Sequence, residues 1–158
     1  MTKTLYSLGK LISSRITTDK KQIPSIIKTY VGNDWLDHSN FCSFNLFDKK
    51  NVYKDENIDI FIISWSHEYV NNIHNHPENG CWLKVMNGLM YEHLYNKDFE
   101  FQEERKIEKN QISYIDNNIG YHGMVNKNFN KAVTLNVYSP PNFKNRYWLF
   151  NEEKNRKT

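Results

Sequence analysis

The sequence has few of the features that would place it in a membrane or outside the cell. Its 158 residues include two cysteines, and no apolar run has the length of a membrane span. The first residues lack the apolar core and small-residue cleavage site of a signal peptide. We therefore expect a cytoplasmic protein with no structural disulfide and no membrane partner.

Charge of one sign is also scarce. The formal net charge is +3, and basic and acidic residues are interspersed without a groove-sized cluster of Lys and Arg. We therefore expect no nucleic-acid partner. Internal repeats and low-complexity linkers are absent as well, and 158 residues suit a single domain with a real core. We expect one domain spanning residues 1–158, in a monomeric protein.

The amino-terminal part has the periodicity of helices. Apolar residues recur at helical spacing in one segment, at Ile23, Ile26, Ile27 and Tyr30. Pro24 suits the first turn of a helix, because its missing N–H has no partner there in any case. We expect helices over residues 4–13 and 22–30, within a helical cap formed by residues 1–40.

From about residue 41 the pattern changes to strands. Short runs rich in β-branched and aromatic residues are separated by turns, with no helices between them. The expected strands include residues 60–65, 81–86, 89–95, 99–108, 112–115 and 132–138. Asn87-Gly88 favours the positive φ angles of a tight type I′ hairpin. These patterns predict a mainly β fold, a small barrel over residues 41–141 with a C-terminal tail over 142–158.

Three histidines are the candidate metal ligands. His74 and His76 are two residues apart, so on an extended strand both side chains point to one face. His122 lies 46 residues downstream, a separation that suits distant strands meeting inside a barrel. Imidazole is a common ligand of both iron and zinc. The ligand types alone therefore predict a divalent metal without deciding which one.

The pattern resembles the motifs of the cupin superfamily. The first cupin motif is matched by His74, His76 and Gly88, and the second by His122 and Asn126. Cys81 stands where the first motif has Glu, a replacement typical of the animal-type cysteine dioxygenases. The resemblance extends roughly from Ile23 to Pro141. It implies a cupin-type, jelly-roll-like barrel.

The resemblance also implies an activity and a set of site residues. A thiol dioxygenase of this type would oxidise L-cysteine with O₂ to cysteine sulfinic acid, at Fe(II) held by the three histidines. Cys81 and Tyr138 match a pair that the family joins by a thioether bond. Trp65 has the spacing of a tryptophan near the family's active site. Thr134 and Asn136 stand at substrate-side positions where the family has Ser and His.

The chain departs from the family at the group that holds the substrate carboxylate. The family uses an Arg there, and Phe44 takes its position in this sequence. No Arg occurs between Arg15 and Arg105. A guanidinium binds carboxylate through two parallel hydrogen bonds, which Phe cannot make. Three explanations stay open: another small thiol such as cysteamine or a mercapto acid, another cationic group such as Lys49 or Lys50, or a weakened enzyme. A metal-binding cupin without catalytic activity is a further alternative.

Overall fold

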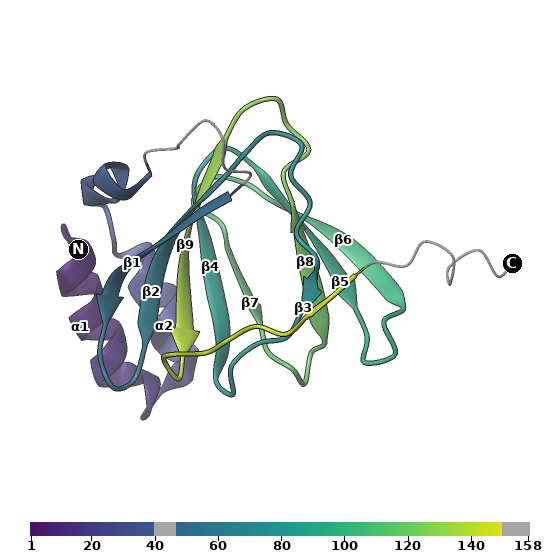
Figure 1. Ribbon diagram of the computed structural model, residues 1–158. Helices are drawn as coiled ribbons and strands as arrows, with labels where there is room; N and C mark the ends of the chain where they lie inside the picture. The colour runs from purple at the N-terminus through teal and green to yellow at the C-terminus, as the bar shows by residue number, and fades with distance from the viewer. Residues whose placement is uncertain (40–46, 150–158) are drawn as a thin grey trace, which may run out of the picture.

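The protein is described by a computed structural model that covers residues 1–39 and 47–149. Helices form its amino-terminal part and strands the remainder (Figure 1). The helical elements are α1 (Leu5–Ile16), η1 (Lys20–Gln22), α2 (Ile23–Lys28) and η2 (Asp34–His38). The two expected helices are thus confirmed as α1 and α2, with ends that differ by one to three residues.

The strands make up most of the remaining chain. They are β1 (Phe47–Lys54), β2 (Asp59–Trp65), β3 (Ile73–His74), β4 (Gly80–Asn87), β5 (Met90–Tyr95), β6 (Phe101–Ile107), β7 (Ile112–Ile115), β8 (Tyr121–Val125), β9 (Ala132–Ser139) and β10 (Tyr147–Trp148). The mainly β fold with an amino-terminal helical segment is therefore confirmed.

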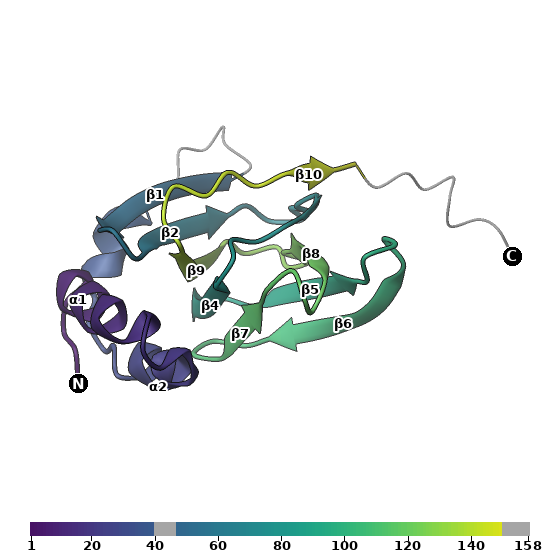
Figure 2. The same cartoon turned by 90° about the horizontal axis from the view of Figure 1, so that it is seen from below.

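The strands form two antiparallel sheets that face each other (Figures 1 and 2). One sheet has the order β1-β2-β9-β4-β7, and the other has the order β10-β3-β8-β5-β6. Strands distant in sequence are thus neighbours, as β9 lies between β2 and β4 and β8 lies between β3 and β5. This topology brings the segments that carry His74 and His122 side by side.

Alternation along each strand separates two apolar clusters. In β2, Ile60 and Ile62 face the helices and belong to a cluster shared with them. Ile63 and Trp65 belong to a second cluster, which also contains Met124 of the opposite sheet. The first sheet therefore has one face under the helices and one face toward the interior between the sheets.

Helix α1 packs against the outer face of the first sheet (Figure 2). It begins after Thr4, whose Oγ1 accepts a hydrogen bond from the backbone N–H of Ser7 at 3.1 Å, as an N-cap residue does. Its buried apolar residues recur at helical spacing: Leu5, Leu8, Ile12 and Ile16. Burying each such side chain stabilises the fold by about 1.5–3 kcal/mol. The helix thereby keeps the outer face of the sheet dry.

The expected hairpin at Asn87-Gly88 is wrong. Strands β4 and β5 flank this dipeptide but belong to different sheets, so they do not pair with each other. Gly88 has a φ of +80°, whereas Asn87 does not have the positive φ that a type I′ turn requires. The dipeptide carries the chain from one sheet to the other. Local turn chemistry signals a reversal, but long-range packing decides which strands pair.

Four strands lie outside the set expected from the sequence: β1, β3, β8 and β10. Strand β1 is rich in Lys, Asp and Asn, so it lacks the apolar composition of a buried strand. Strand β8 contains Gly123, which weakens its strand pattern. Strands β3 and β10 have two residues each, too few for a periodic signal. Strand β10 falls in the segment expected to be a tail, yet it pairs with β3, with Tyr147 opposite His74. This pairing places an aromatic residue beside the histidines.

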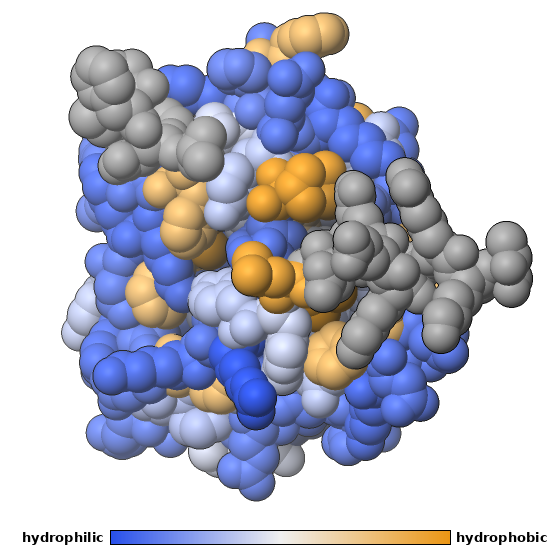
Figure 3. Space-filling model, turned by 45° about the vertical axis from the view of Figure 1, so that its right-hand side comes forward, coloured by the Kyte–Doolittle hydropathy of each residue, from blue (hydrophilic) through white to orange (hydrophobic). Residues whose placement is uncertain are grey.

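Hydrophilic side chains cover most of the face drawn in Figure 3, and apolar side chains form only small patches there. Such scattered exposure is ordinary for a folded protein surface. Within residues 1–39 and 47–149, no helix has the length and apolar character needed to cross a membrane.

Candidate metal centre

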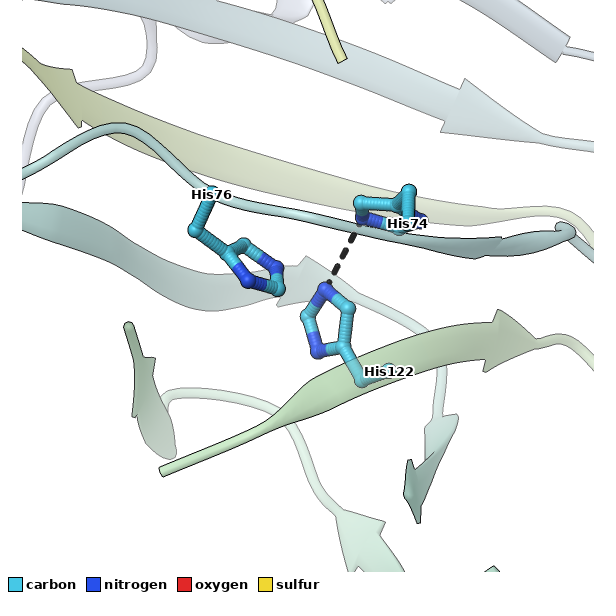
Figure 4. A group of neighbouring side chains, drawn as sticks. All are labelled: His74, His76 and His122. Atoms are coloured by element: carbon cyan, nitrogen blue, oxygen red, sulfur yellow. Dashed lines mark hydrogen bonds between the residues drawn. The ribbon is translucent and has the colours of Figure 1, made fainter. Parts of the chain in front are cut away.

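The two strands β3 and β8 and the segment after β3 bring three histidines together (Figure 4). His74 ends β3 and lies directly opposite His122 of β8. His76 follows two residues later, and its ring centroid lies 4.4 Å from that of His122. The candidate ligand nitrogens of the three rings all lie within 4.8 Å of one another, and all three side chains are buried. The predicted convergence of these residues is confirmed.

Hydrogen bonds fix which ring nitrogen carries the proton in two of the histidines. Nδ1 of His74 lies 2.9 Å from the backbone carbonyl oxygen of Asn72, which can only accept. Nδ1 of His122 lies 2.7 Å from Oε1 of Glu92. Both Nδ1 atoms are therefore donors, and in the neutral rings each Nε2 keeps a free lone pair. These two Nε2 atoms face each other at 3.0 Å, an arrangement that requires a cation or a proton between them.

His76 has no hydrogen-bond partner for either ring nitrogen among the described residues. Leaving a buried polar atom unpaired costs about 1–3 kcal/mol. Its backbone is nevertheless held firmly, because the side chain of Asn117 accepts from its N–H and donates to its carbonyl oxygen, each at 2.8 Å. The ring is thus positioned by the backbone and left free to bind another group.

The donor set fits a divalent metal ion. Two nitrogens bound at about 2.1 Å and at a right angle lie about 3 Å apart, which matches the separation between His74 and His122. Burial lowers the pKa of His74 to about 3 and that of His76 well below its usual value. Both rings are therefore neutral, the form in which imidazole binds metals. The cluster is a candidate metal site built from three nitrogen ligands.

Glu92 is a residue of the candidate site that was not predicted from the sequence. Its side chain is 1% exposed, and its second oxygen accepts a hydrogen bond from the hydroxyl of Ser113 at 2.9 Å. Burial alone would raise its pKa, but the hydrogen bonds from His122 and Ser113 help to lower it on balance, so it remains a carboxylate. Such a partner orients a metal-binding imidazole and increases its basicity. The sequence did contain one sign of this position: Glu92 lies two residues from each of the apolar residues Met90 and Leu94, so it points to the buried face of β5.

Cys81 and Tyr138 lie directly opposite each other on β4 and β9. Both side chains are buried, and Cys81 is a free thiol. Burial raises the pKa of Cys81 to about 12 and that of Tyr138 well above its ordinary value. The thiol and the phenol are therefore both protonated at neutral pH. Directly opposed strand residues have their Cβ atoms about 5 Å apart, close enough for their side chains to touch.

Trp65, Thr134 and Asn136 form one buried hydrogen-bond chain. The indole N–H of Trp65 donates to Oγ1 of Thr134 at 3.0 Å, and that hydroxyl donates to Oδ1 of Asn136 at 2.6 Å. The amide nitrogen of Asn136 then points toward Sγ of Cys81, at 4.0 Å. The three expected substrate-side residues are therefore connected to one another. They fix the orientation of the Asn136 amide beside Cys81.

A small cavity is lined by Trp65 and Asn136 and by two of the three histidines, His74 and His122. Its lining comes from both sheets and from the segments before β3 and β10: Phe47, Lys49, Ile63, Trp65, Asn71, His74, Leu83, His122, Met124, Asn136, Tyr138, Asn145 and Tyr147. Among residues 1–39 and 47–149, Lys49 is the one Lys or Arg in this lining. Phe44, expected at the family's Arg position, lies outside the described residues.

Comparison with known proteins identifies the family of this chain. The family model for cysteine dioxygenase type I matches residues 3–148. The chain belongs to the cysteine dioxygenase type I family. Among curated relatives, cysteine dioxygenase type 1 of Rattus norvegicus is 27% identical over 155 residues, covering 88% of this chain and 76% of the relative. The human protein of the same name is 26% identical over 155 residues, covering 88% of this chain and 76% of the relative.

Solved structures support the cupin fold. A Klebsiella pneumoniae protein with a double-stranded β-helix domain has a TM-score of 0.59 at 16% identity, covering 71% of this chain and 87% of that one. A sugar phosphate isomerase of the cupin superfamily from Silicibacter pomeroyi has a TM-score of 0.51 at 13% identity, covering 60% of this chain and 59% of that one. The cupin-type barrel expected for a cysteine dioxygenase is thereby confirmed.

Proposed function

We propose that this protein is a thiol dioxygenase that oxidises L-cysteine with O₂ to cysteine sulfinic acid, using Fe(II) held by His74, His76 and His122. The observation that carries the proposal is the pair of lone-pair-bearing Nε2 atoms facing each other at 3.0 Å, with a third imidazole unpaired beside them. Membership of the cysteine dioxygenase type I family supports the reaction class.

Iron bound at this cluster would supply the redox chemistry that lets ground-state dioxygen react with a thiolate. Three neutral imidazoles add no negative charge, so the site keeps the full charge of a divalent ion and favours an anionic thiolate. Hydrogen bonds from the histidines to Glu92 and to the Asn72 carbonyl, and from the His76 backbone to Asn117, hold the three residues in place. The protein thereby presents three nitrogen ligands on one face of the candidate site.

The remaining site residues orient the reactants and exclude water. The phenol of Tyr138 stays protonated and is a hydrogen-bond donor toward substrate or dioxygen. Trp65 and Thr134 hold the Asn136 amide on the same face of β9 as Tyr138. Tyr147 packs against His74, with the ring centroids 5.5 Å apart. We also propose a cytoplasmic location. The buried free thiol of Cys81 is compatible with the reducing conditions there.

The test is aerobic incubation of the Fe(II)-loaded protein with a panel of small thiols, followed by mass spectrometry and measurement of oxygen uptake. We expect a sulfinic acid that has gained two oxygen atoms per thiol, and loss of this product in the His122→Ala variant. Turnover of cysteamine or a mercapto acid in place of L-cysteine would favour another thiol as substrate. Metal binding without oxygen uptake for any thiol would favour the non-catalytic metal-binding cupin.

A further inference from the structure

We infer that Lys49 is the group that binds the carboxylate of the thiol substrate, and that it makes the site selective for thiols that carry a carboxylate. This inference rests on the proposed function and deepens it. It also decides among the explanations left open by the missing arginine, because it assigns the cationic role to a different residue type on β1.

The position of Lys49 follows from strand register. Lys49 of β1 lies opposite Ile63 of β2, which lies opposite Thr134 of β9. Directly opposed residues in antiparallel strands point to the same face. Lys49 is therefore on the inner face that carries Thr134, and also Asn136 and Tyr138, the two residues of β9 that line the cavity. The same cavity is lined by His74 and His122, so a cation and the candidate metal ligands share it.

The surroundings of the Lys49 ammonium group are aromatic rather than acidic. Its Nζ lies 4.1 Å from the ring centroid of Phe61 and 4.7 Å from that of Tyr138. These cation–π contacts hold the charge over the two ring faces. Within residues 1–39 and 47–149, no hydrogen bond or ion pair engages this Nζ, although an ammonium group has three N–H donors. The group is thus a partly buried cation with donors to spare.

The carboxylate whose charge acts on Lys49 is that of Asp59, and it is already engaged elsewhere. The carboxylate of Asp59 accepts a hydrogen bond from the side-chain amide of Asn51 at 3.0 Å and another from the backbone N–H of Asn142 at 2.6 Å. It lies beyond ion-pair distance of Lys49, although its charge acts on that residue. An anion that enters the cavity is therefore the natural partner of the ammonium group.

A ligand that engages both Lys49 and the histidine cluster carries two groups on a short frame. A thiolate suits the histidine cluster, and a carboxylate suits Lys49. L-Cysteine has both groups, whereas cysteamine lacks the carboxylate and L-cysteine methyl ester has it neutralised. An ammonium ion is a point charge without the fork geometry of a guanidinium. Lys49 should therefore select for the charge of the carboxylate more than for its exact orientation.

The neighbouring residue Lys50 offers a matched control. It points to the opposite face of β1, its side chain is 41% exposed, and its Nζ lies 3.8 Å from Oδ2 of Asp48. We propose to compare the unmodified protein with Lys49→Met, Lys49→Arg and Lys50→Met. Each Fe(II)-loaded protein would be tested with L-cysteine, cysteamine and L-cysteine methyl ester. Calorimetric binding in the absence of oxygen is measured beside kcat/KM in air.

We expect Lys49→Met to weaken L-cysteine binding by about 10- to 100-fold, the value of one charge-assisted hydrogen bond. Binding of cysteamine and of the methyl ester should change by less than about twofold, because neither offers a carboxylate for that bond. Lys49→Arg should keep most of the preference for L-cysteine, and Lys50→Met all of it. An equal loss for all three ligands in Lys49→Met would overturn the assignment.

The design separates failure of this inference from failure of the proposed function. If Lys49→Met selectively loses L-cysteine binding but no protein oxidises any thiol, the proposed dioxygenase function is wrong. Lys49 is then still supported as the group that binds the carboxylate. If L-cysteine is oxidised and the selectivity of Lys49→Met is unchanged, the dioxygenase function is supported and the role of Lys49 is wrong. If Lys49→Met does not fold, the unmodified protein still decides the question. Binding the methyl ester or cysteamine as tightly as L-cysteine would rule Lys49 out.

Discussion

Glu92 and His122 form a buried pair across the neighbouring strands β5 and β8, with Oε1 of Glu92 accepting a hydrogen bond from Nδ1 of His122 at 2.7 Å. The pair fixes the tautomer of His122, so that its Nε2 lone pair points at His74. A carboxylate in this position also makes the imidazole a stronger ligand. Glu92, which orients the candidate metal ligand His122, is thus on a different strand from that ligand.

The first prediction tests whether Glu92 orients His122 for metal binding. Replacing Glu92 by Ala removes the acceptor that orients His122, and metal affinity should fall by about 10- to 100-fold. Glu92→Gln keeps the shape without the charge and should have a smaller effect. Glu104→Gln is the control, because Glu104 lies at the surface and pairs with His93 and Lys127. Equilibrium dialysis against Fe(II) measures the affinity. Equal affinities in the Glu92 and Glu104 variants would contradict the role of Glu92.

The second prediction concerns metal removal and stability. Metal at about 1,000 times its dissociation constant stabilises the folded state by about 4 kcal/mol. For a chain of this size the midpoint of thermal unfolding should therefore rise by about 10 °C, and a chelator should reverse the rise. His74→Ala, His76→Ala and His122→Ala should each lose most of this response and most of the bound iron.

His93→Ala is the matched control for the histidine variants, because His93 lies on β5 but pairs with Glu104 at the surface. It should respond to metal as the unmodified protein does. A full thermal response in His76→Ala would exclude His76 as a ligand. Differential scanning calorimetry with and without Fe(II) provides the comparison.

The sequence predicted those parts of the site that depend on residue type and spacing. The His74–His76 spacing and the second motif at His122 were enough to anticipate the cluster, because metal ligands must be a particular kind of side chain. The pairing of Cys81 with Tyr138 was expected from the family resemblance alone, and the register of β4 with β9 places the two residues opposite each other. Local periodicity likewise gave α1, α2 and most of the long strands.

The parts that the sequence could not provide depend on long-range pairing. Asn87-Gly88 has the chemistry of a hairpin, but β4 and β5 enter different sheets because each finds its buried partners elsewhere. Glu92 gains its role only from the neighbouring strand that carries His122. Lys49 gains its position from the register of β1 with β2, which places it on the inner face. No window of sequence around these residues contains that information.

The third prediction concerns a covalent link between Cys81 and Tyr138. Repeated turnover in air should join Sγ of Cys81 to the ring of Tyr138, with loss of the thiol hydrogen and one ring hydrogen to dioxygen as the oxidant. The intact mass should then fall by two hydrogens. Cys81→Ser and Tyr138→Phe should keep their own unlinked masses. Peptide mapping after alkylation is the measurement, and recovery of fully alkylatable Cys81 after many turnovers would argue against the link.

The fourth prediction concerns the buried chain through Trp65, Thr134 and Asn136. Thr134→Val removes the hydroxyl that accepts from the Trp65 indole and donates to Asn136, so both partners are left buried and unpaired. The free energy of unfolding should fall by about 1–3 kcal/mol. Thr134→Ser keeps the hydroxyl and loses only a methyl group, so it should remain closer to the unmodified protein. Urea denaturation measures both variants.

The same pair of variants separates structure from positioning. Without the Thr134 hydroxyl nothing in the described chain fixes which end of the Asn136 amide faces Cys81, because Oδ1 loses its donor. We therefore expect Thr134→Val to lower kcat for L-cysteine more than it raises KM, since the ligand-binding groups His74, His122 and Lys49 are untouched. Thr134→Ser should restore kcat. A rise in KM alone, with kcat preserved in Thr134→Val, would mean that the chain supports only the fold and the substrate pocket, and that the orientation of Asn136 does not matter to the reaction.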